Sequence, residues 1–143
     1  MPTIERALTI AAPPDRVWSL ASDLEREPEF WKGSKAVRTL GVQGPYVERE
    51  VTLAFQGRLQ RERVLLEPPR RIRHELVEGP MRGSKTVELV PSEGGTEVRV
   101  VWDIRLRGLL KLGARMVSRH VGEGTQNALE RIRDAAEGRP PSV

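Results

Sequence analysis

The sequence contains no cysteine, only two histidines and no long hydrophobic run. The absence of cysteine excludes disulfide bonds and thiol chemistry, and it is typical of proteins from a reducing compartment. No apolar stretch approaches the roughly 18 residues of a membrane-spanning helix, and residues 1–10 lack the pattern of a signal peptide. Two histidines without cysteine do not favour a metal site. We therefore expect a soluble, cytoplasmic protein that holds neither a metal nor another cofactor.

Charged residues are abundant, but the two signs are mixed. The 24 basic and 20 acidic residues leave a net charge of +4, and Arg supplies 20 of the 24 basic residues. No run reaches five like charges, which is typical of a solvated surface and not of a nucleic-acid face. The arginine excess is equally compatible with genome composition or a warm habitat. We do not expect a nucleic-acid partner.

The last third of the sequence has the periodicity of one long helix. Apolar residues recur at steps of three and four from Leu109 to Gly138, which predicts a helix of about 45 Å. Gly113, Gly122 and Gly124 lie inside it and cost about 1 kcal/mol each relative to alanine, so we expect another part of the molecule, or a cavity, beside them. The length predicts a single domain over residues 1–138 and a flexible tail at 139–143.

The part before this helix reads mainly as strands. Alternation predicts a first strand at Thr3–Ile10, and proline and helical spacing predict two short helices between Pro13 and Gly33. Six further strands are predicted at Ser34–Leu40, Tyr46–Phe55, Arg58–Leu66, Arg71–Val77, Gly83–Val90 and Thr96–Leu106. Short turns rich in glycine and proline join them, which favours an antiparallel meander with one buried face.

Several segments resemble a known superfamily. They are Ile10–Trp18, Asp23–Glu25 with Phe30-Trp31, Leu89–Pro91 with Gly94–Thr96, and Val121–Glu123. These segments resemble the polyketide cyclase/dehydrase and lipid-transport families of the START and birch-pollen-allergen (SRPBCC) superfamily. The resemblance implies an α+β helix-grip fold, in which a curved antiparallel sheet of about seven strands wraps around a long C-terminal helix. Such motifs specify a fold rather than a ligand.

The same resemblance implies a cavity between the helix and the sheet. Residues predicted to line it and to bind a ligand are Trp31, Val51, Leu53, Phe55, Leu59, Ile72, His74, Leu76, Val87, Leu89, Val100, Trp102, Leu112, Met116, His120 and Val121. An apolar pocket with few polar groups is the usual site for a small molecule. The same residues can also pack as a solid core, and periodicity does not separate the two interpretations.

Four polar residues share the predicted inner face of the sheet: Arg49, Arg61, Arg63 and His74. A buried guanidinium requires a carboxylate or a ligand, so converging arginines favour a ligand with an acid, enol or phenol oxygen. A strand register displaced by one residue would instead turn Arg61 and Arg63 to solvent. For His74, a hydrogen-bonded histidine in the core or the cavity wall is the ordinary interpretation. Both registers stay open at this point.

Our leading hypothesis is that the protein binds or transports a small hydrophobic ligand such as a lipid, a quinone or a polyketide-like molecule. The alternative is an enzyme of the polyketide cyclase or aromatase type, in which Arg61 or Arg63 stabilises an enolate and His74 moves protons. A third hypothesis is a module that contacts proteins or ribosomes through its basic surface. No catalytic constellation stands out, which favours binding; the oligomeric state stays open.

Overall fold

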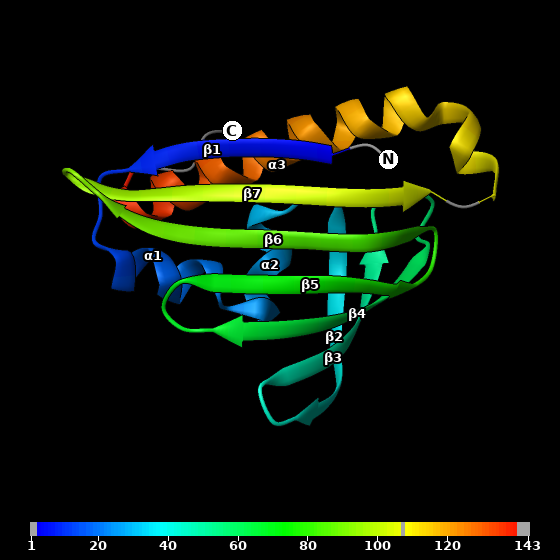
Figure 1. Ribbon diagram of the computed structural model, residues 1–143, viewed down its shortest axis with the longest axis horizontal. Helices are drawn as coiled ribbons and strands as arrows, with labels where there is room; N and C mark the ends of the chain where they lie inside the picture. The colour runs from blue at the N-terminus through cyan, green and yellow to red at the C-terminus, as the bar shows by residue number, and fades with distance from the viewer. Residues whose placement is uncertain (1–2, 107, 140–143) are drawn as a thin grey trace.

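A computed structural model describes residues 3–106 and 108–139 as one sheet with helices on one of its faces (Figure 1). The elements in chain order are β1 (Thr3–Ile10), α1 (Pro14–Ala21), η1 (Leu24–Arg26), α2 (Glu27–Phe30), β2 (Ser34–Gln43), β3 (Tyr46–Leu53), β4 (Leu59–Glu67), β5 (Arg71–Glu78), β6 (Met81–Ser92), β7 (Gly95–Leu106), η2 (Gly108–Gly113) and α3 (Ala114–Glu137). The strands pair antiparallel in the order β1-β7-β6-β5-β4-β3-β2. The predicted helix-grip fold is confirmed.

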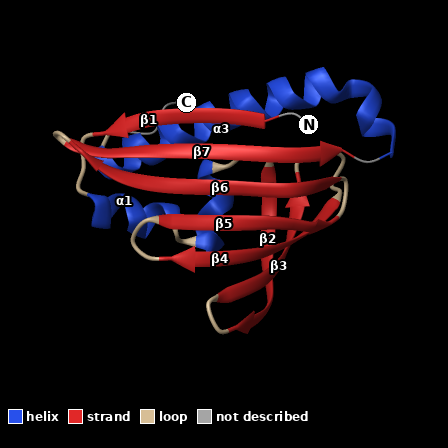
Figure 2. Cartoon of the chain, in the orientation of Figure 1, coloured by secondary structure: helices blue, strands red, loops and turns tan. Residues whose placement is uncertain are grey.

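The sheet is strongly curved and encloses the helices from one side. In Figure 1, β2 runs almost across the direction of β5, β6 and β7. Figure 2 shows α1, α2 and α3 on the same face of the sheet, with α3 passing behind β1 and β7. Antiparallel strands joined by short turns need only one covered face, and the helices supply that cover.

The long helix begins later than its periodicity predicts. Residues Gly108–Gly113 form the 3₁₀ helix η2, and α3 begins at Ala114 with Gly113 as its N-cap. The predicted start at Leu109 is therefore wrong, because a 3₁₀ turn precedes the α-helix. Its predicted end is right: Gly138 adopts φ 73°, a left-handed conformation that favours glycine, and its N–H donates to the last turn. Of the predicted tail, all but Arg139 lies outside the described residues.

The two glycines within α3 have different neighbours. A Cβ added to Gly122 would lie 2.5 Å from Nη2 of Arg6 on β1, which is the flexible end of that side chain, so a larger residue here would require Arg6 to move. A Cβ on Gly124 would meet no atom within 4 Å, and this residue borders a cavity. The sequence analysis expected either another part of the molecule or a cavity beside these glycines; the side chain of Arg6 lies beside Gly122 and the cavity beside Gly124.

The interior is solid in one half and hollow in the other. The second half of α3 contributes Leu129, Ile132 and Ala136 to the main core. This core also contains Val17 of α1 and Phe30 of α2, together with the buried sheet residues Ile10, Val64, Ile72, Val87, Leu89, Val98 and Val100. The first half of α3 stands over a smaller core at Ile4, Ile104 and Leu106. The space left beside this smaller core is the cavity described below.

Strand β4 has the register in which Gln60, and not Leu59, faces the interior. Gln60 is fully buried, whereas Leu59 is 54% exposed. The amide of Gln60 donates to the backbone carbonyls of Glu78 and Met81, which satisfies it in the interior. Consequently Arg61 is exposed, and the guanidinium of Arg63 stacks 4.3 Å from the ring of Tyr46. Of the two registers that the sequence left open, the structure has the one in which Arg61 and Arg63 face away from the cavity, because the inward side chains of β4 are those that share the parity of the buried Gln60 and Val64.

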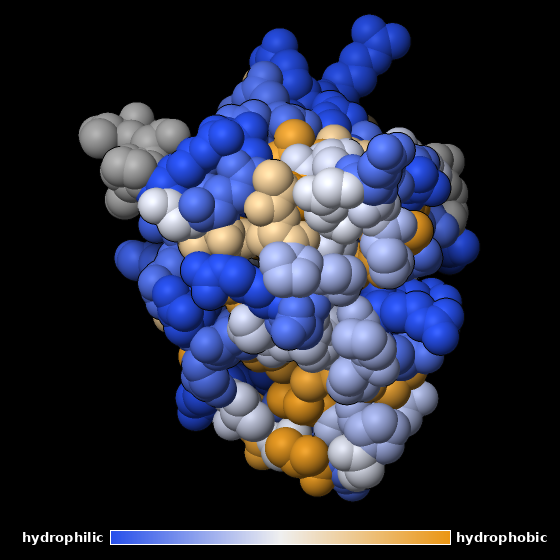
Figure 3. Space-filling model, turned by 90° about the vertical axis from the view of Figure 1, so that its left-hand side faces the viewer, coloured by the Kyte–Doolittle hydropathy of each residue, from blue (hydrophilic) through white to orange (hydrophobic). Residues whose placement is uncertain are grey.

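The outer surface is mainly hydrophilic. Figure 3 shows apolar atoms gathered at its lower edge, the level at which Figure 1 places the β2–β3 hairpin. Leu40 and Val42 are the exposed large apolar residues of β2. Within the described part of the chain, none of the helices has both the length and the apolar character needed to cross a bilayer.

Candidate functional site

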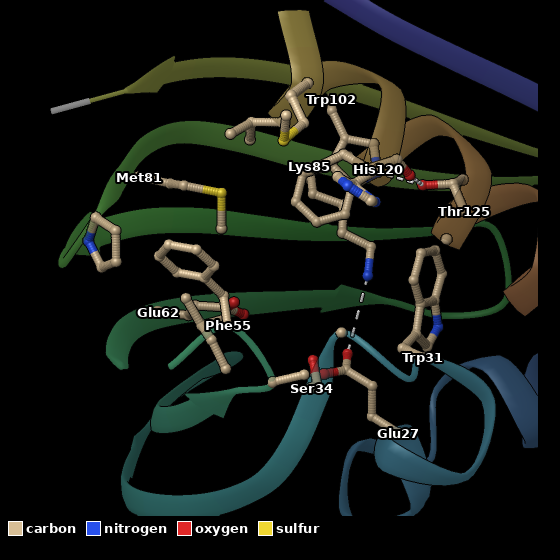
Figure 4. Close-up of a pocket in the computed structure, with 18 residues that line it drawn as sticks. Glu27, Trp31, Ser34, Phe55, Glu62, Met81, Lys85, Trp102, His120 and Thr125 are labelled. Atoms are coloured by element: carbon tan, nitrogen blue, oxygen red, sulfur yellow. Dashed lines mark hydrogen bonds and ion pairs between the residues drawn. The ribbon is translucent and has the colours of Figure 1, made fainter. Parts of the chain in front are cut away.

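A cavity of about 500 Å³ lies between the first half of α3 and the sheet. Figure 4 shows Trp31, Lys85 and Trp102 at one end of it and Phe55 and Met81 toward the other. The full lining is Glu27, Trp31, Gly33, Ser34, Leu53, Ala54, Phe55, Glu62, Pro80, Met81, Lys85, Trp102, Met116, Val117, His120, Val121, Gly124 and Thr125. Most of this lining is apolar, and the charged groups gather at one side.

The structure brings together part of the predicted lining. The predicted residues that border the cavity are Trp31, Leu53, Phe55, Trp102, Met116, His120 and Val121. Others are buried away from it: Val51, Ile72, His74, Leu76, Val87, Leu89 and Val100. Leu59 and Leu112 are exposed, Leu112 at 87%. These nine placements are corrections, because α1, α2 and the second half of α3 fill one half of the interior and leave only the other half hollow.

The strand register places a row of polar and aromatic side chains across the inner face. Arg49 of β3 pairs with Glu62 of β4. Lys85 of β6 pairs with His74 on one side and with Trp102 of β7 on the other. Directly opposed residues on neighbouring strands point to the same face, so these side chains meet on the concave side of the sheet.

Arg49 is the centre of a buried charge cluster. Its side chain is 2% exposed, and its Nη2 lies 2.8 Å from Oε2 of Glu27 and 2.9 Å from Oε1 of Glu62. Glu27 comes from the first turn of α2, so the ion pair joins a helix to the sheet. Nδ1 of His74 donates to Oε1 of Glu62 at 3.0 Å. Each ion is thereby paired, as burial requires.

The cluster holds its carboxylates ionised. Burial raises the pKa of Glu62, but the hydrogen bond from His74 and the charge of Arg49 outweigh it and lower the pKa to about 2. For Glu27 burial is likewise outweighed, mainly by Arg49, so its pKa is lowered. Burial and the nearby Lys85 lower the pKa of His74, which is therefore neutral at pH 7. The charges of Glu27 and Glu62 overcome burial and raise the pKa of Arg49.

Lys85 is the cation that reaches the cavity. Its Nζ lies 3.2 Å from the ring centroid of Trp31 and 5.0 Å from that of Trp102, which is cation–π geometry. Oε1 of Glu27 is 4.0 Å away, an ion-pair distance but too long for a hydrogen bond. Burial lowers the pKa of Lys85 to about 8, and Arg49 adds to this effect against the two carboxylates. The ammonium thus has its charge balanced, and Lys85 borders the cavity with its Nζ directed toward Glu27 (Figure 4).

A hydrogen bond anchors α3 to the sheet beside the cavity. Nε1 of Trp102 donates to Oγ1 of Thr125 at 2.9 Å, and this hydroxyl donates to the carbonyl of Val121 at 2.7 Å. We expect Thr125→Val to destabilise the protein by about 2 kcal/mol, because it leaves the indole N–H without its acceptor. Thr125→Ser keeps the hydroxyl and serves as the control. Urea unfolding measures both; equal stability of the two variants would contradict the assignment.

Sequence reasoning missed the three charged groups of the cavity wall. Lys85 shares the parity of Val87 and Leu89, which the sequence analysis had already placed inward, so it could have been found. Glu62 shares the parity of Val64, but the wrong register of β4 hid it. Glu27 lies in a four-residue helix whose burial has no periodic signal.

These features define the class of protein: a helix-grip domain with a largely apolar cavity that is partly open to solvent. The chain belongs to the polyketide cyclase/dehydrase and lipid transport family, whose sequence profile matches residues 1–137. A comparison with curated proteins finds no match.

Solved structures share the fold at low sequence identity. TTHA0849 from Thermus thermophilus is 22% identical, with a TM-score of 0.81 over 96% of this chain and 98% of that one. The Zhui aromatase/cyclase from Streptomyces sp. R1128 is 19% identical, with a TM-score of 0.84 over 95% and 93% of the two chains. A START superfamily protein from Mycobacterium smegmatis is 18% identical, with a TM-score of 0.73 over 95% and 97%.

Proposed function

We propose that this protein binds a small hydrophobic molecule in the cavity beneath α3 and carries it in solution. The observation on which this proposal depends is the cavity itself, about 500 Å³ in volume and lined mostly by apolar side chains. This size and composition match the usual site for a small organic ligand. Membership of a family described by polyketide chemistry and lipid transport supports a ligand of this kind.

The two parts of the wall have different roles in the proposed binding. Apolar residues such as Leu53, Met116 and Val121 surround the body of the ligand. Burying about 200 Å² of apolar ligand surface contributes roughly 5 kcal/mol before the costs of ordering. The charged side of the cavity, at Lys85, receives a polar group and fixes the orientation of the ligand.

The competing hypotheses lose their specific support. The enzymatic interpretation needed Arg61 or Arg63 in the cavity wall, and both lie on the outer face of the sheet. His74 is buried behind Glu62 and does not border the cavity. The third hypothesis rested on the basic surface alone, and the cavity beneath α3 supports a ligand-binding role instead.

Gly124→Phe tests the proposal directly. A side chain at this position enters open space at the cavity wall, so we expect it to weaken the binding of a neutral hydrophobic probe such as N-phenyl-1-naphthylamine at least about tenfold. The fold should persist, since glycine is unfavourable inside a helix. Asn127→Phe, on the exposed side of the same helix, is the matched control and should bind like wild type. Fluorescence titration measures all three proteins.

The result that contradicts the proposal is a wild-type protein without saturable binding, or a Gly124→Phe variant that binds as well as Asn127→Phe. Mass spectrometry of small molecules released from purified wild-type protein provides the complementary measurement. We expect hydrophobic compounds to be enriched relative to those from the Gly124→Phe variant.

A further inference from the structure

We propose that the cavity selects neutral ligands whose carbonyl oxygen accepts a hydrogen bond from Lys85, in preference to carboxylates of the same shape. This inference rests on the proposed function, because it names the chemical class that the cavity binds. Its basis is the geometry around one ammonium group and the charge balance of the groups that surround it.

The ammonium of Lys85 can donate more hydrogen bonds than it makes within the described residues. An ammonium group has three donors and no acceptor. Within the described part of the chain, its contacts are the rings of Trp31 and Trp102 and the ion pair at 4.0 Å with Glu27, and none of these is a hydrogen bond. A buried ammonium with unused donors at a cavity wall favours a ligand that brings an acceptor.

The buried groups around Lys85 have no net charge before a ligand binds. At neutral pH the cluster contains two cations, Arg49 and Lys85, and two carboxylates, Glu27 and Glu62, while the lowered pKa of His74 leaves it neutral. The sum is zero before any ligand binds. A carbonyl oxygen accepts from Lys85 and keeps this balance. A bound carboxylate would add an uncompensated negative charge beside Glu27 and Glu62, both of which border the cavity.

The cation at position 85 is a lysine and not an arginine. Arg supplies 20 of the 24 basic residues of this chain, yet the cation at the cavity wall is a lysine. A guanidinium has five donors in a planar fork that matches a carboxylate, whereas an ammonium is a compact point charge. Nζ of Lys85 contacts the indoles of Trp31 and Trp102, whose centroids are 6.4 Å apart, and Lys85 borders the cavity. A single acceptor oxygen fits this arrangement better than the two oxygens of a carboxylate.

The test compares three probes of one shape: 2-acetylnaphthalene, 2-naphthoate and 2-ethylnaphthalene. They present a ketone, a carboxylate and an ethyl group at the same position. Isothermal titration calorimetry on the wild-type protein at pH 7 should give a dissociation constant for the ketone about tenfold lower than for either of the other two probes. The reason is that the free energy of a hydrogen bond to a charged donor is at least as large as that of a tenfold change in affinity.

Lys85→Met provides the matched variant. The ketone should lose about tenfold in affinity, while 2-ethylnaphthalene should keep its wild-type affinity and thereby report an intact cavity. Should this variant fail to fold, the wild-type protein supplies the same information through pH. Because the ketone binds the ammonium form, its affinity should fall as pH rises past the lysine pKa of about 8, while that of the ethyl compound stays constant.

The outcomes separate the two proposals. A ketone that binds no tighter than 2-ethylnaphthalene, or a naphthoate that binds tightest, overturns the selection by Lys85 and leaves the hydrophobic cavity site intact. If none of the three naphthalene probes binds and the N-phenyl-1-naphthylamine titration shows no saturable binding, the proposed function is overturned and this inference with it.

Discussion

Replacing Arg49 by methionine is expected to destabilise the protein by about 3–5 kcal/mol. The guanidinium is the hydrogen-bonding partner of both Glu27 and Glu62, and all three side chains are at most 10% exposed. Methionine has a similar length but no charge, so the variant leaves two carboxylates in the interior with Lys85 as the remaining cation. Free energies of unfolding from urea titrations at pH 7 measure the effect.

Arg38→Met is the matched control for this prediction. Arg38 pairs with Glu50 at 3.2 Å between the adjacent strands β2 and β3, but its side chain is 69% exposed. An exposed pair of this kind contributes less than about 1 kcal/mol. If Arg49→Met is no more destabilising than Arg38→Met, the buried cluster does not stabilise the fold.

Acidification is expected to remove about 3 kcal/mol of stability through Glu62 alone. The pKa of this carboxyl is about 2 in the folded protein, against 4.5 as its ordinary value. A group whose folded pKa is depressed contributes its full stability above the unfolded pKa and loses it as the pH falls toward the folded pKa. The difference of roughly two to three units converts to about 3 kcal/mol, lost between about pH 4.5 and pH 2.

Glu62→Gln isolates this contribution. The variant is less stable than wild type at neutral pH, because Arg49 and His74 lose their charged acceptor. Its free energy of unfolding should vary less between pH 5 and pH 2, by about 3 kcal/mol, since the group that titrates is gone. Glu29→Gln removes a carboxylate whose pKa the hydrogen bond from Arg26 also lowers, but this pair is exposed and screened by solvent, so the slope should change far less than in Glu62→Gln. Equal slopes for all three proteins would refute the assignment.

The order of helices and strands could be predicted from the sequence, because the residues that mark strands, turns and helix ends act locally. Alternation and turn residues located all seven strands to within a few residues, and Pro13-Pro14 and Gly138 marked helix boundaries. The start of α3 did not follow, because the apolar period continues through the 3₁₀ turn at Gly108–Gly113. Periodicity reports which face is buried, and it does not distinguish the two kinds of helix.

The site was less accessible to such reasoning. Trp31, Trp102 and His120 border the cavity; strand parity orients Trp102 and helix spacing orients His120, whereas Trp31 follows the end of α2. Whether an inward residue such as Val87 meets a ligand or another side chain depends on where α1, α2 and α3 pack, which is a property of the whole fold. The sequence could not decide between the two registers of β4 at Arg61 and Arg63, because the burial of Gln60, whose amide donates to backbone carbonyls, decides it.

The division of the interior into a packed half and an open half has a consequence for sequence change. Leu129, Ile132 and Val17 meet neighbours on every side, so substitutions there alter the free energy of unfolding. Leu53, Met116 and Val121 border the cavity, so a larger or smaller side chain there changes the shape of the cavity and has little effect on the free energy of unfolding. The fold can therefore be retained while substitutions at the cavity wall change which ligands bind.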